Sequence, residues 1–492
     1  MSGRRALGLL ACGLALLALT ASGLYAQHAT GPEEFVAVAL AQGGVYLFAL
    51  ALTWRCAASP RVLAVILGIA ATMRIVVLIA PPLLSSDIYR YVWDGRVLAA
   101  GINPYRYIPT DPHLASLRDA EIFPEINRSN YAPTIYPPAA EVIFLAVAGT
   151  GGGVTAMKAA MVAFEAIAVL LLLRLFAVMG LPRTRIIVYA WHPLPLWEFA
   201  GSGHIDAAVI AFVVLALWTR RRSSALSFRG RQSGNPEPMN TRLSRAAPTV
   251  GQGRPDPVFM GSGFGAARRP GMTLTGVALA LGVLVKFYPA VLFPALWRRE
   301  WRMPAAFATV LALAYLPFLG VGWQVFGFLP GYLAEEGFTG GGAGFYLWSA
   351  AHAMLPRGGV PDIAYIAGAA CLLAGLALYL GLRRERPDSD VFGAALLAAA
   401  FTFLLSPHYS WYFAWLIVFA CLVPSASLLW LTLASFLLYL VPVGSQLVRD
   451  RHRFFVESAL YVPFLMLAAM DLWRRRAPRA AKEQLRHGDT TG

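Results

Sequence analysis

Runs of about twenty apolar residues recur along the whole 492-residue chain. Each is long enough to cross a bilayer hydrocarbon core of roughly 30 Å as a helix. Because backbone groups in lipid must be hydrogen-bonded within the protein, spans of this kind form helices rather than open sheets. The chain is 58% hydrophobic and only 14% charged, whereas soluble domains are about a quarter charged. We therefore expect an all-α, polytopic integral membrane protein with about 12–14 transmembrane helices.

Basic residues flank these apolar runs and give the chain its net charge of +15. A nucleic-acid-binding protein would need one continuous basic face with exposed aromatic side chains, and this distribution does not provide one. Basic clusters beside membrane spans instead mark cytoplasmic loops. The clusters are Arg4–Arg5, Arg183–Arg185, Arg220–Arg222, Arg298–Arg302, Arg383–Arg386 and Arg474–Arg479. Placing them inside puts both ends of the chain in the cytoplasm and residues 84–136 outside.

The same pattern divides the chain into six regions. We expect three membrane spans in 1–83, an extracytoplasmic catalytic loop with juxtamembrane helices in 84–154, spans in 155–220, a disordered cytoplasmic insertion in 221–271, spans with an outer loop at 321–361 in 272–472, and a basic cytoplasmic tail in 473–492. The insertion is rich in Arg, Gly, Pro and Ser and has no apolar periodicity. The first apolar run is compatible with a cleaved signal peptide or a retained span.

The apolar stretch Tyr136–Thr150 is short for a span, and it lies between Pro137-Pro138 and Gly151–Gly153. If it crossed the membrane, Arg183–Arg185 would lie outside, against the charge rule. We therefore predict a re-entrant or interfacial helix, which is tolerated at membrane depth where it lines a cavity.

The segment Ser85–Tyr105, SSDIYRYVWDGRVLAAGINPY, places acids directly after the third apolar run. Carboxylates at the edge of a membrane span are costly, so they indicate a functional site. Asp87 and Asp94 are seven residues apart and would share one face of a helix, with Arg90 near the same stripe.

Other polar residues reach the predicted outer surface from distant segments. They are Arg96, Asn103, His204–Asp206, Lys286, Glu335–Glu336 and His408. Several also have ordinary structural explanations. Asp94 before Gly95 and the His204–Asp206 turn are typical of helix ends. Lys286 is compatible with a snorkelling side chain, and His408 with an interfacial belt.

An outward-facing acid with several cations at a membrane surface suits an enzyme that uses a polyprenyl-phosphate-linked sugar. Arg90, Arg96, Lys286 or His408 would neutralise the phosphate. An ionised Asp would take a proton from the acceptor hydroxyl, which is worth roughly 10²–10⁴-fold in rate. The aromatic residues nearby either stack on sugars or mark the interface, namely Tyr89, Tyr91, Trp93, Tyr105, Tyr107, Trp411 and Tyr412.

Four stretches resemble the glycosyltransferase C superfamily, multi-pass enzymes with a catalytic acid in the first large outer loop. They are residues 85–105 with TIYPP (134–138), WHPLPLWEFAGSGHID (191–206), VKFYPAVLFPAL (285–296) and SPHYSWYFAW (406–415). In order and spacing they are similar to bacterial polyprenol-phosphate-mannose-dependent mannosyltransferases. The similarity covers most of residues 60–425.

The resemblance implies roles for particular residues. Asp87 would be the general base, and Asp94 a second catalytic acid. The remaining candidates would bind the substrate or the donor phosphate, namely Arg90, Arg96, Tyr105, Glu198, His204, Asp206, Lys286, His408 and Tyr409. Some members of the superfamily need a divalent cation and others do not. A cation here would need oxygen ligands beyond Asp87 and Asp94, and Glu335–Glu336 could supply them; we assign no residue as a metal ligand.

We therefore predict a membrane glycosyltransferase on the outer face of a bacterial cytoplasmic membrane. It would transfer a hexose, mannose by preference, from a polyprenyl-phosphate-sugar donor to a lipid or glycan acceptor with inversion. One alternative is a transporter or flippase of lipid-linked sugars, which should show internal repeats and mid-span charges. Another is a glycan polymerase or ligase with large outer loops. The loop acid Asp87 favours the first interpretation.

Overall fold

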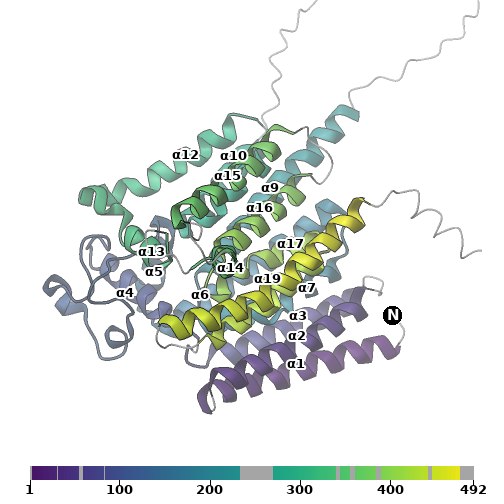
Figure 1. Cartoon of the computed structure of the whole chain (residues 1–492), viewed down its shortest axis with the longest axis horizontal. Helices are drawn as coiled ribbons and strands as arrows, with labels where there is room; N and C mark the ends of the chain where they lie inside the picture. Colours follow the sequence, from purple (N-terminus) through teal and green to yellow (C-terminus); the bar gives the residue numbers. More distant parts are fainter. Residues whose placement is uncertain are drawn as a thin grey trace, which may run out of the picture.

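The computed structural model describes residues 3–29, 31–54, 59–82, 84–232, 270–297, 299–338, 344–354, 361–383, 389–441 and 446–476. Within these ranges the chain is mostly helical and contains no strand. Most helices lie side by side with similar axis directions and form one bundle (Figure 1). The prediction of an all-α polytopic membrane protein is confirmed.

Seven helical stretches in the described ranges are long and apolar enough to cross a membrane. They are α1 (Gly3–Ala29), α2 (Pro32–Trp54), α3 (Pro60–Leu78), α6 (Val154–Met179), the stretch Arg302–Glu335 that begins with α12 (Arg302–Tyr315), α15 (Asp362–Leu382) and α19 (Gln446–Arg476). Five shorter apolar stretches accompany them, at Pro138–Ala148, Gly271–Val285, Ser389–Leu405, Ser410–Leu422 and Ala426–Leu440.

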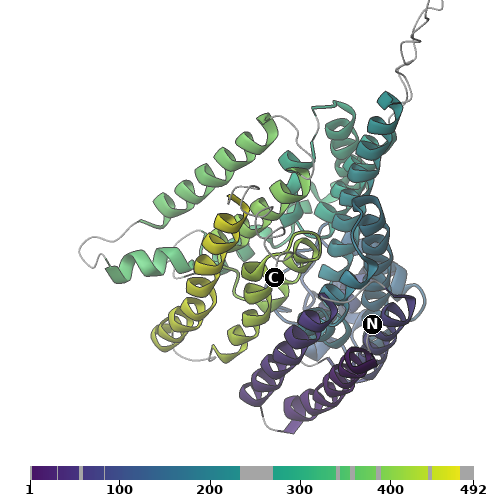
Figure 2. The ribbon, with the colours of Figure 1, turned by 90° about the vertical axis from the view of Figure 1, so that its right-hand side faces the viewer.

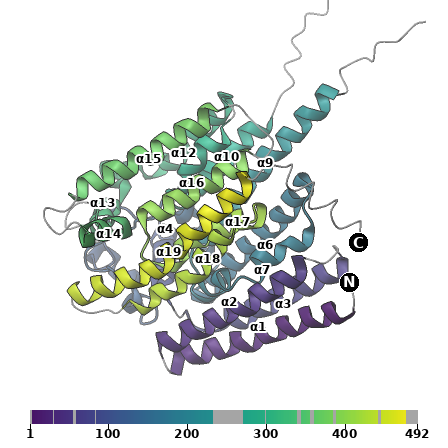
Figure 3. The same ribbon diagram turned by 45° about the vertical axis from the view of Figure 1, so that its right-hand side comes forward.

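The two ends of the bundle carry different segments. The start of α1 and the end of α9 (Asp206–Gln232) lie at one end, on the right in Figures 1 and 3. Helix α4 (Asp87–Ala99) and the loop that follows it lie at the other end (Figure 1). This loop continues to α5 (Pro138–Ala148), and α13 (Leu329–Glu335) lies close to it. The first loop therefore forms one end of the molecule.

The bundle is packed unevenly. Within the most apolar 18-residue part of α2, 44% is buried inside the protein. The corresponding parts of Arg302–Glu335 and α15 are only 6% and 11% buried. Figure 2 shows α15, in light green, at the edge of the bundle. Helices α12 and α15 are therefore peripheral, and α13 and α14 (Tyr346–Met354) connect them at the same end as α4.

Residues 184–200 lie in the region 155–220 that was predicted to hold membrane spans, but they form a series of short helical turns. These are η3 (Arg183–Ile186), α7 (Ile187–Ala190), α8 (Pro193–Pro195) and the π-type turn η4 (Leu196–Gly201). Pro193 and Pro195 have no backbone N–H, so a regular α-helix is interrupted there. His192 stabilises the break, because its Nδ1 accepts a hydrogen bond from the Leu194 N–H at 3.1 Å.

Residues 288–297, within the predicted region of spans 272–472, are broken in the same way, into η5 (Tyr288–Leu292) and α11 (Phe293–Leu296). Pro289 and Pro294 interrupt it. The first broken segment directly precedes the start of α9, and the second directly follows the end of α10 (Pro270–Val285). Irregular backbone therefore lies beside Asp206 and Lys286, the polar residues at these two helix ends.

Helices α4 and α5 pack closely at Gly95. A Cβ atom at this position would lie 2.7 Å from the carbonyl carbon of Phe144 in α5. Gly95 does not break the helix, which continues to Ala99. Tyr91, one turn earlier, stacks on the Phe144 ring with centroids 4.7 Å apart. The short helix expected at Tyr136–Thr150 is thus α5, and it holds α4 in place.

Two helices extend past the boundaries of the predicted regions. The cytoplasmic insertion was expected to begin at residue 221, but α9 continues as a helix to Gln232. The basic tail was expected from residue 473, but α19 continues to Arg476. Basic and straight-chain residues have good helix propensity, so each helix extends past its apolar part. The rest of the insertion, 233–269, and of the tail, 477–492, lies outside the described residues.

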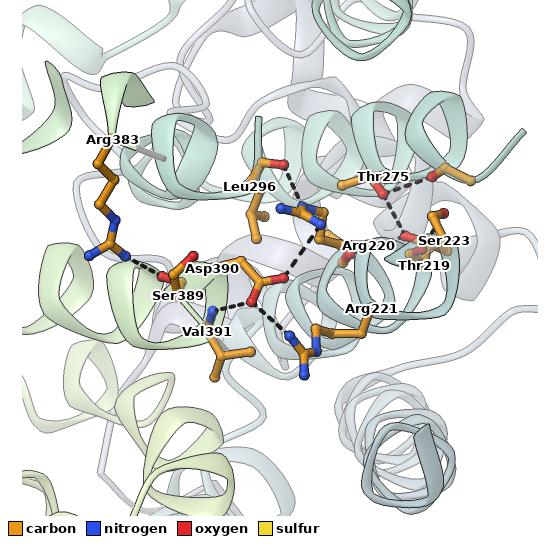
Figure 4. A network of polar contacts seen from close by, with 12 residues as sticks. Thr219, Arg220, Arg221, Ser223, Thr275, Leu296, Arg383, Ser389, Asp390 and Val391 are labelled. Carbon is orange, nitrogen blue, oxygen red and sulfur yellow. Dashed lines mark hydrogen bonds and ion pairs between the residues drawn. The ribbon is translucent and has the colours of Figure 1, made fainter. Parts of the chain in front are cut away.

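A buried ionic network joins three helices toward the end of the bundle where α9 terminates (Figure 4). Arg221 Nη1 lies 3.1 Å from Asp390 Oδ1, and Arg220 Nη1 lies 3.6 Å from the other carboxylate oxygen. The Arg220 Nε also donates to the Leu296 carbonyl at 2.9 Å. These bonds tie α9 to α11 and to α16 (Ser389–Leu405).

Candidate active site

Asp87 is the first residue of α4 and lies where the first loop meets the bundle. Its backbone N–H donates to Ser85 Oγ at 3.2 Å, which starts the helix. Asn127 Nδ2, from the loop, donates to Asp87 Oδ1 at 2.7 Å. Within the described part of the chain, no cation lies within ion-pair distance of this partly buried carboxylate.

Burial raises the pKa of the Asp87 carboxyl, since the charged form is poorly solvated. The Lys286 ammonium and the Asn127 hydrogen bond lower it, and the balance lies above the ordinary value. A carboxylate in these surroundings is a stronger base than an exposed one.

A second acid, Asp206, lies in a tight group beside Asp87. Lys286 Nζ donates to Asp206 Oδ2 at 2.7 Å, and the Tyr288 hydroxyl donates to Oδ1 at 3.0 Å. The same ammonium lies 4.6 Å from the centre of the Tyr412 ring. The end of α10 and the start of α9 therefore meet through a charged bond. Both ends reach the group around Asp87, whose pKa both charges affect.

An aromatic stack extends from this group toward the surface. His204 stacks on Trp411 with ring centroids 4.0 Å apart, and Trp411 stacks on Tyr409 at 4.5 Å. Glu198 lies behind His204, with Oε2 3.5 Å from Nε2, and its Oε1 accepts from the Tyr439 hydroxyl at 2.8 Å. The outermost ring, Tyr409, is 38% exposed. It offers a flat apolar face on which a sugar ring could stack.

Two ion pairs join the first loop and the aromatic segment to the C-terminal end of α13. Arg128 donates from Nε to Glu335 Oε2 at 2.8 Å, and the Tyr131 hydroxyl donates to Oε1 at 3.0 Å. His408 Nδ1 lies 3.1 Å from Glu336 Oε2. Arg128 has a φ of 55°, a conformation that is rare outside glycine, so its position is strained. The pair Glu335–Glu336 thus holds two segments over the group around Asp87.

Four of the predicted residues lie elsewhere. Arg90 Nε binds both oxygens of Asp94, at 2.8 and 2.9 Å, and both side chains are buried. Arg90 also donates to the Ala132 carbonyl at 3.0 Å. The seven-residue spacing therefore did not make Asp94 a partner of Asp87. Both Asp94 oxygens contact Arg90, which favours a structural role for both residues.

The other two residues support the loop. Arg96 forms an ion pair with Asp119, whose second oxygen accepts the Ile122 N–H at 2.6 Å. The Tyr105 hydroxyl donates to the Tyr136 carbonyl at 2.7 Å. Neither side chain lies in the group around Asp87. Their partners, Asp119 and Tyr136, lie in the loop between α4 and α5, so both side chains stabilise the first loop.

Sequence reasoning missed several members of the group. Tyr288 stands inside the quoted VKFYP stretch, where a polar partner for Asp206 could have been sought. Asn127 and Arg128 lie in a loop without periodicity, and no pattern there indicated that they approach Asp87. Arg453 at the start of α19 resembled an ordinary basic flank, although its Nη1 lies 3.4 Å from His408 Nε2.

The residues do not fit a divalent cation between the two predicted acids. Asp94 is bound by Arg90, and Glu335 and Glu336 are bound by Arg128 and His408. Across the described ranges, no group of three or more His, Cys, Asp or Glu side chains is arranged to hold a metal.

Two family models match this chain. Residues 6–298 match the one described as alpha-(1->6)-mannopyranosyltransferase, N-terminal domain. Residues 244–407 match glycosyltransferase family 87. No curated protein and no solved structure matches. The first match spans more than half of the chain and contains Asp87, Asp206 and Lys286.

Proposed function

The chain belongs to the alpha-(1->6)-mannopyranosyltransferase family, and on that premise we propose that it transfers mannose from a polyprenyl phosphate to a hydroxyl of a lipid or glycan. Both family matches are glycosyltransferases, so the protein is a transferase. The observation that carries the proposal is the environment of the Asp87 carboxylate. It is a partly buried carboxylate, bonded to Asn127 and free of an ion-pair partner among the described residues, beside the Asp206–Lys286 pair.

Asp87 acts as the general base in this scheme. The acceptor hydroxyl gives its proton to an Asp87 oxygen while its own oxygen bonds to C1 of the mannose. The bond between C1 and the phosphate oxygen breaks, and its electron pair stays with the leaving polyprenyl phosphate. The raised pKa of Asp87 makes it a better proton acceptor than an exposed Asp, and general-base catalysis contributes roughly 10²–10⁴-fold.

A single displacement of this kind inverts the configuration at C1. The family name specifies an α-(1→6) linkage. If the product of this chain has an α linkage, one inversion requires a donor whose mannose is β-linked to phosphate. The stereochemistry of donor and product thus provides a check on the mechanism that is independent of any mutation.

We place the reaction on the outer face of a bacterial cytoplasmic membrane. Support comes from the basic residues Arg220 and Arg221 toward the end of the bundle where α9 terminates, opposite the end that carries Asp87. Basic residues favour the cytoplasmic side. On this orientation a donor that carries its sugar on the outer leaflet reaches Asp87 without crossing the bilayer.

The experiment is a transfer assay with purified protein, a membrane lipid extract and radiolabelled polyprenyl-phosphate mannose, glucose or arabinose in parallel. We expect the mannose label to move to an acceptor and to be released only by glycosidic cleavage. Asp87→Asn should abolish the transfer. Movement of intact donor across a vesicle membrane without bond formation would instead identify a flippase, and full activity of Asp87→Asn would exclude the proposed base.

A further inference from the structure

Helices α16 and α19 lie side by side and antiparallel, with a groove between two points of contact (Figures 1 and 3). At one point Phe403 packs against Phe464, with ring centroids 5.7 Å apart. At the other, the Arg475 guanidinium lies over the Phe392 ring, 5.1 Å from its centre. On each helix the two points are eleven residues apart, or about 16 Å at 1.5 Å per residue. The groove is therefore bounded at both ends, and its length matches the roughly 15 Å that one leaflet contributes to a bilayer core.

Small and apolar side chains line the groove between these points. Ala395 and Ala399 on α16 and Ala468 on α19 are among them, and the volume of the groove is about 180 Å³. An apolar cavity of about 150 Å³ is already large enough to bind a benzene-sized molecule. Leu472 at the edge is 40% exposed, so the groove opens to the outside of the bundle. In a membrane the outside is hydrocarbon, and because an unfilled void forfeits dispersion contacts, the groove suits an acyl chain.

One end of the groove is polar and carries a cation. Arg475 Nη2 donates to the Pro424 carbonyl at 2.9 Å, and no carboxylate of the described residues lies within ion-pair distance of this guanidinium. Asp471, one turn earlier, also lines this end, but its Oδ2 accepts from Ser425 Oγ and from the N–H and Oγ of Ser427, at 3.0–3.1 Å. A guanidinium has five N–H donors, so Arg475 has donors left for an external anion.

This polar end lies at a membrane surface far from the candidate active site. Phe392 follows Asp390 by two residues, and Asp390 belongs to the ionic network at the end of the bundle opposite Asp87 (Figure 4). Trp473, beside Arg475, is 71% exposed. Trp side chains are enriched at membrane interfaces, and basic pockets between membrane helices bind anionic lipid headgroups. The groove thus combines a place for a hydrocarbon chain with a cation at headgroup level.

We propose that this groove binds an anionic phospholipid, with one acyl chain between α16 and α19 and its phosphate on Arg475. The bound lipid fills the space between the two helices and stabilises the bundle at the end opposite Asp87. The chain segment after Arg476 is a poorer occupant, because it is mostly polar and Leu485 is its one large apolar residue. The site requires no sugar transfer, so it stands or falls independently of the proposed function.

The test titrates the full-length protein in detergent with phosphatidylglycerol and follows thermal unfolding and native mass spectra. We expect one retained lipid per chain and an unfolding temperature that rises with phosphatidylglycerol. Phosphatidylcholine with the same chains should act more weakly, and inorganic phosphate should have no effect. Arg475→Gln should weaken the apparent affinity for phosphatidylglycerol about tenfold, and Arg475→Lys should recover part of it. Arg474→Gln is the control, because Arg474 is exposed and does not line the groove.

A second variant tests the groove itself. Ala399→Leu places a larger apolar side chain in it, so without lipid the unfolding temperature should stay equal or rise, while the response to phosphatidylglycerol should be lost. Ala374→Leu, at an exposed position of α15, is the matched control and should keep the wild-type response. Equal stabilisation by both lipids, stabilisation by inorganic phosphate alone, or a full lipid response in Ala399→Leu overturns the proposal. So does a wild-type protein that does not respond to lipid, or a dimer that buries α16 and α19 instead.

Discussion

Asp87→Asn separates a catalytic carboxylate from a structural one. The substitution keeps the size of the side chain and an oxygen that accepts from Asn127 Nδ2, so the local geometry should persist. It removes the basic oxygen. Loss of general-base catalysis lowers kcat roughly 10²–10⁴-fold, which is about 3–5 kcal/mol in activation free energy.

The same substitution should not destabilise the fold. The pKa of Asp87 is higher in the folded protein than in the unfolded chain. At pH values above the pKa of an ordinary Asp, ionisation of Asp87 therefore opposes folding. A neutral Asn removes this cost, so the thermal unfolding temperature should stay equal or rise. Loss of activity with unchanged stability is the expected combination.

Asp94→Asn is the matched control, seven residues along the same helix. Its wild-type carboxylate neutralises the buried Arg90, so the substitution leaves a buried cation with weakened compensation. Breaking a buried pair in this way costs about 3–5 kcal/mol. The assay is mannosyl transfer together with thermal unfolding in the same detergent. Wild-type turnover by Asp87→Asn, or a stability loss as large as that of Asp94→Asn, would refute the reasoning.

Three further outcomes follow. The transfer rate should fall as the pH drops through the pKa of Asp87, at a higher pH than for an exposed Asp, because the ionised form is the base; a profile flat from neutral pH down to the ordinary Asp range would contradict this. Gly95→Ala should separate α4 from α5 and cost about 1–3 kcal/mol of stability, while Gly68→Ala in α3, where a Cβ meets nothing within 4 Å, should be neutral in an unfolding assay. Arg74→Met should destabilise by about 3–5 kcal/mol because Glu165 loses its 2.8 Å partner, and Arg74→Met with Glu165→Met should recover most of that, as a double-mutant cycle would show.

Apolar length predicted the regular spans well and the broken ones badly. Helices α1, α2 and α6 lie in regions predicted to hold spans, because uninterrupted apolar residues in lipid satisfy their backbone hydrogen bonds only as a helix. Residues 184–200 are also largely apolar, but two prolines and buried polar partners such as His192 favour separate turns. Composition averages over a window and cannot register these local bonds.

The sequence indicated several residues of the candidate site, but it did not indicate which of them bind each other. Asp206 and Lys286 were both expected at the outer end, yet 80 residues separate them and nothing local indicated that they bind each other. Helix spacing placed Asp94 on the same face as Asp87. The same spacing also allowed an i,i+4 ion pair with Arg90, and that is the pair that forms. Arg453 was overlooked, because a basic residue next to a span is ordinary and only the distance to His408 distinguishes it.

The loose attachment of α12 and α15 makes the bilayer itself part of the site. The end of the molecule around Asp87 is built from tightly packed α4 and α5 on one side and from ion pairs at Glu335 and Glu336 on the other. The helical stretch Arg302–Glu335, which carries the first of these acids, has an apolar window that is only 6% buried within the protein. In a membrane this exposed apolar surface would face acyl chains instead of protein side chains. We therefore expect the approach of Glu335 to the first loop to differ between a detergent micelle and a bilayer.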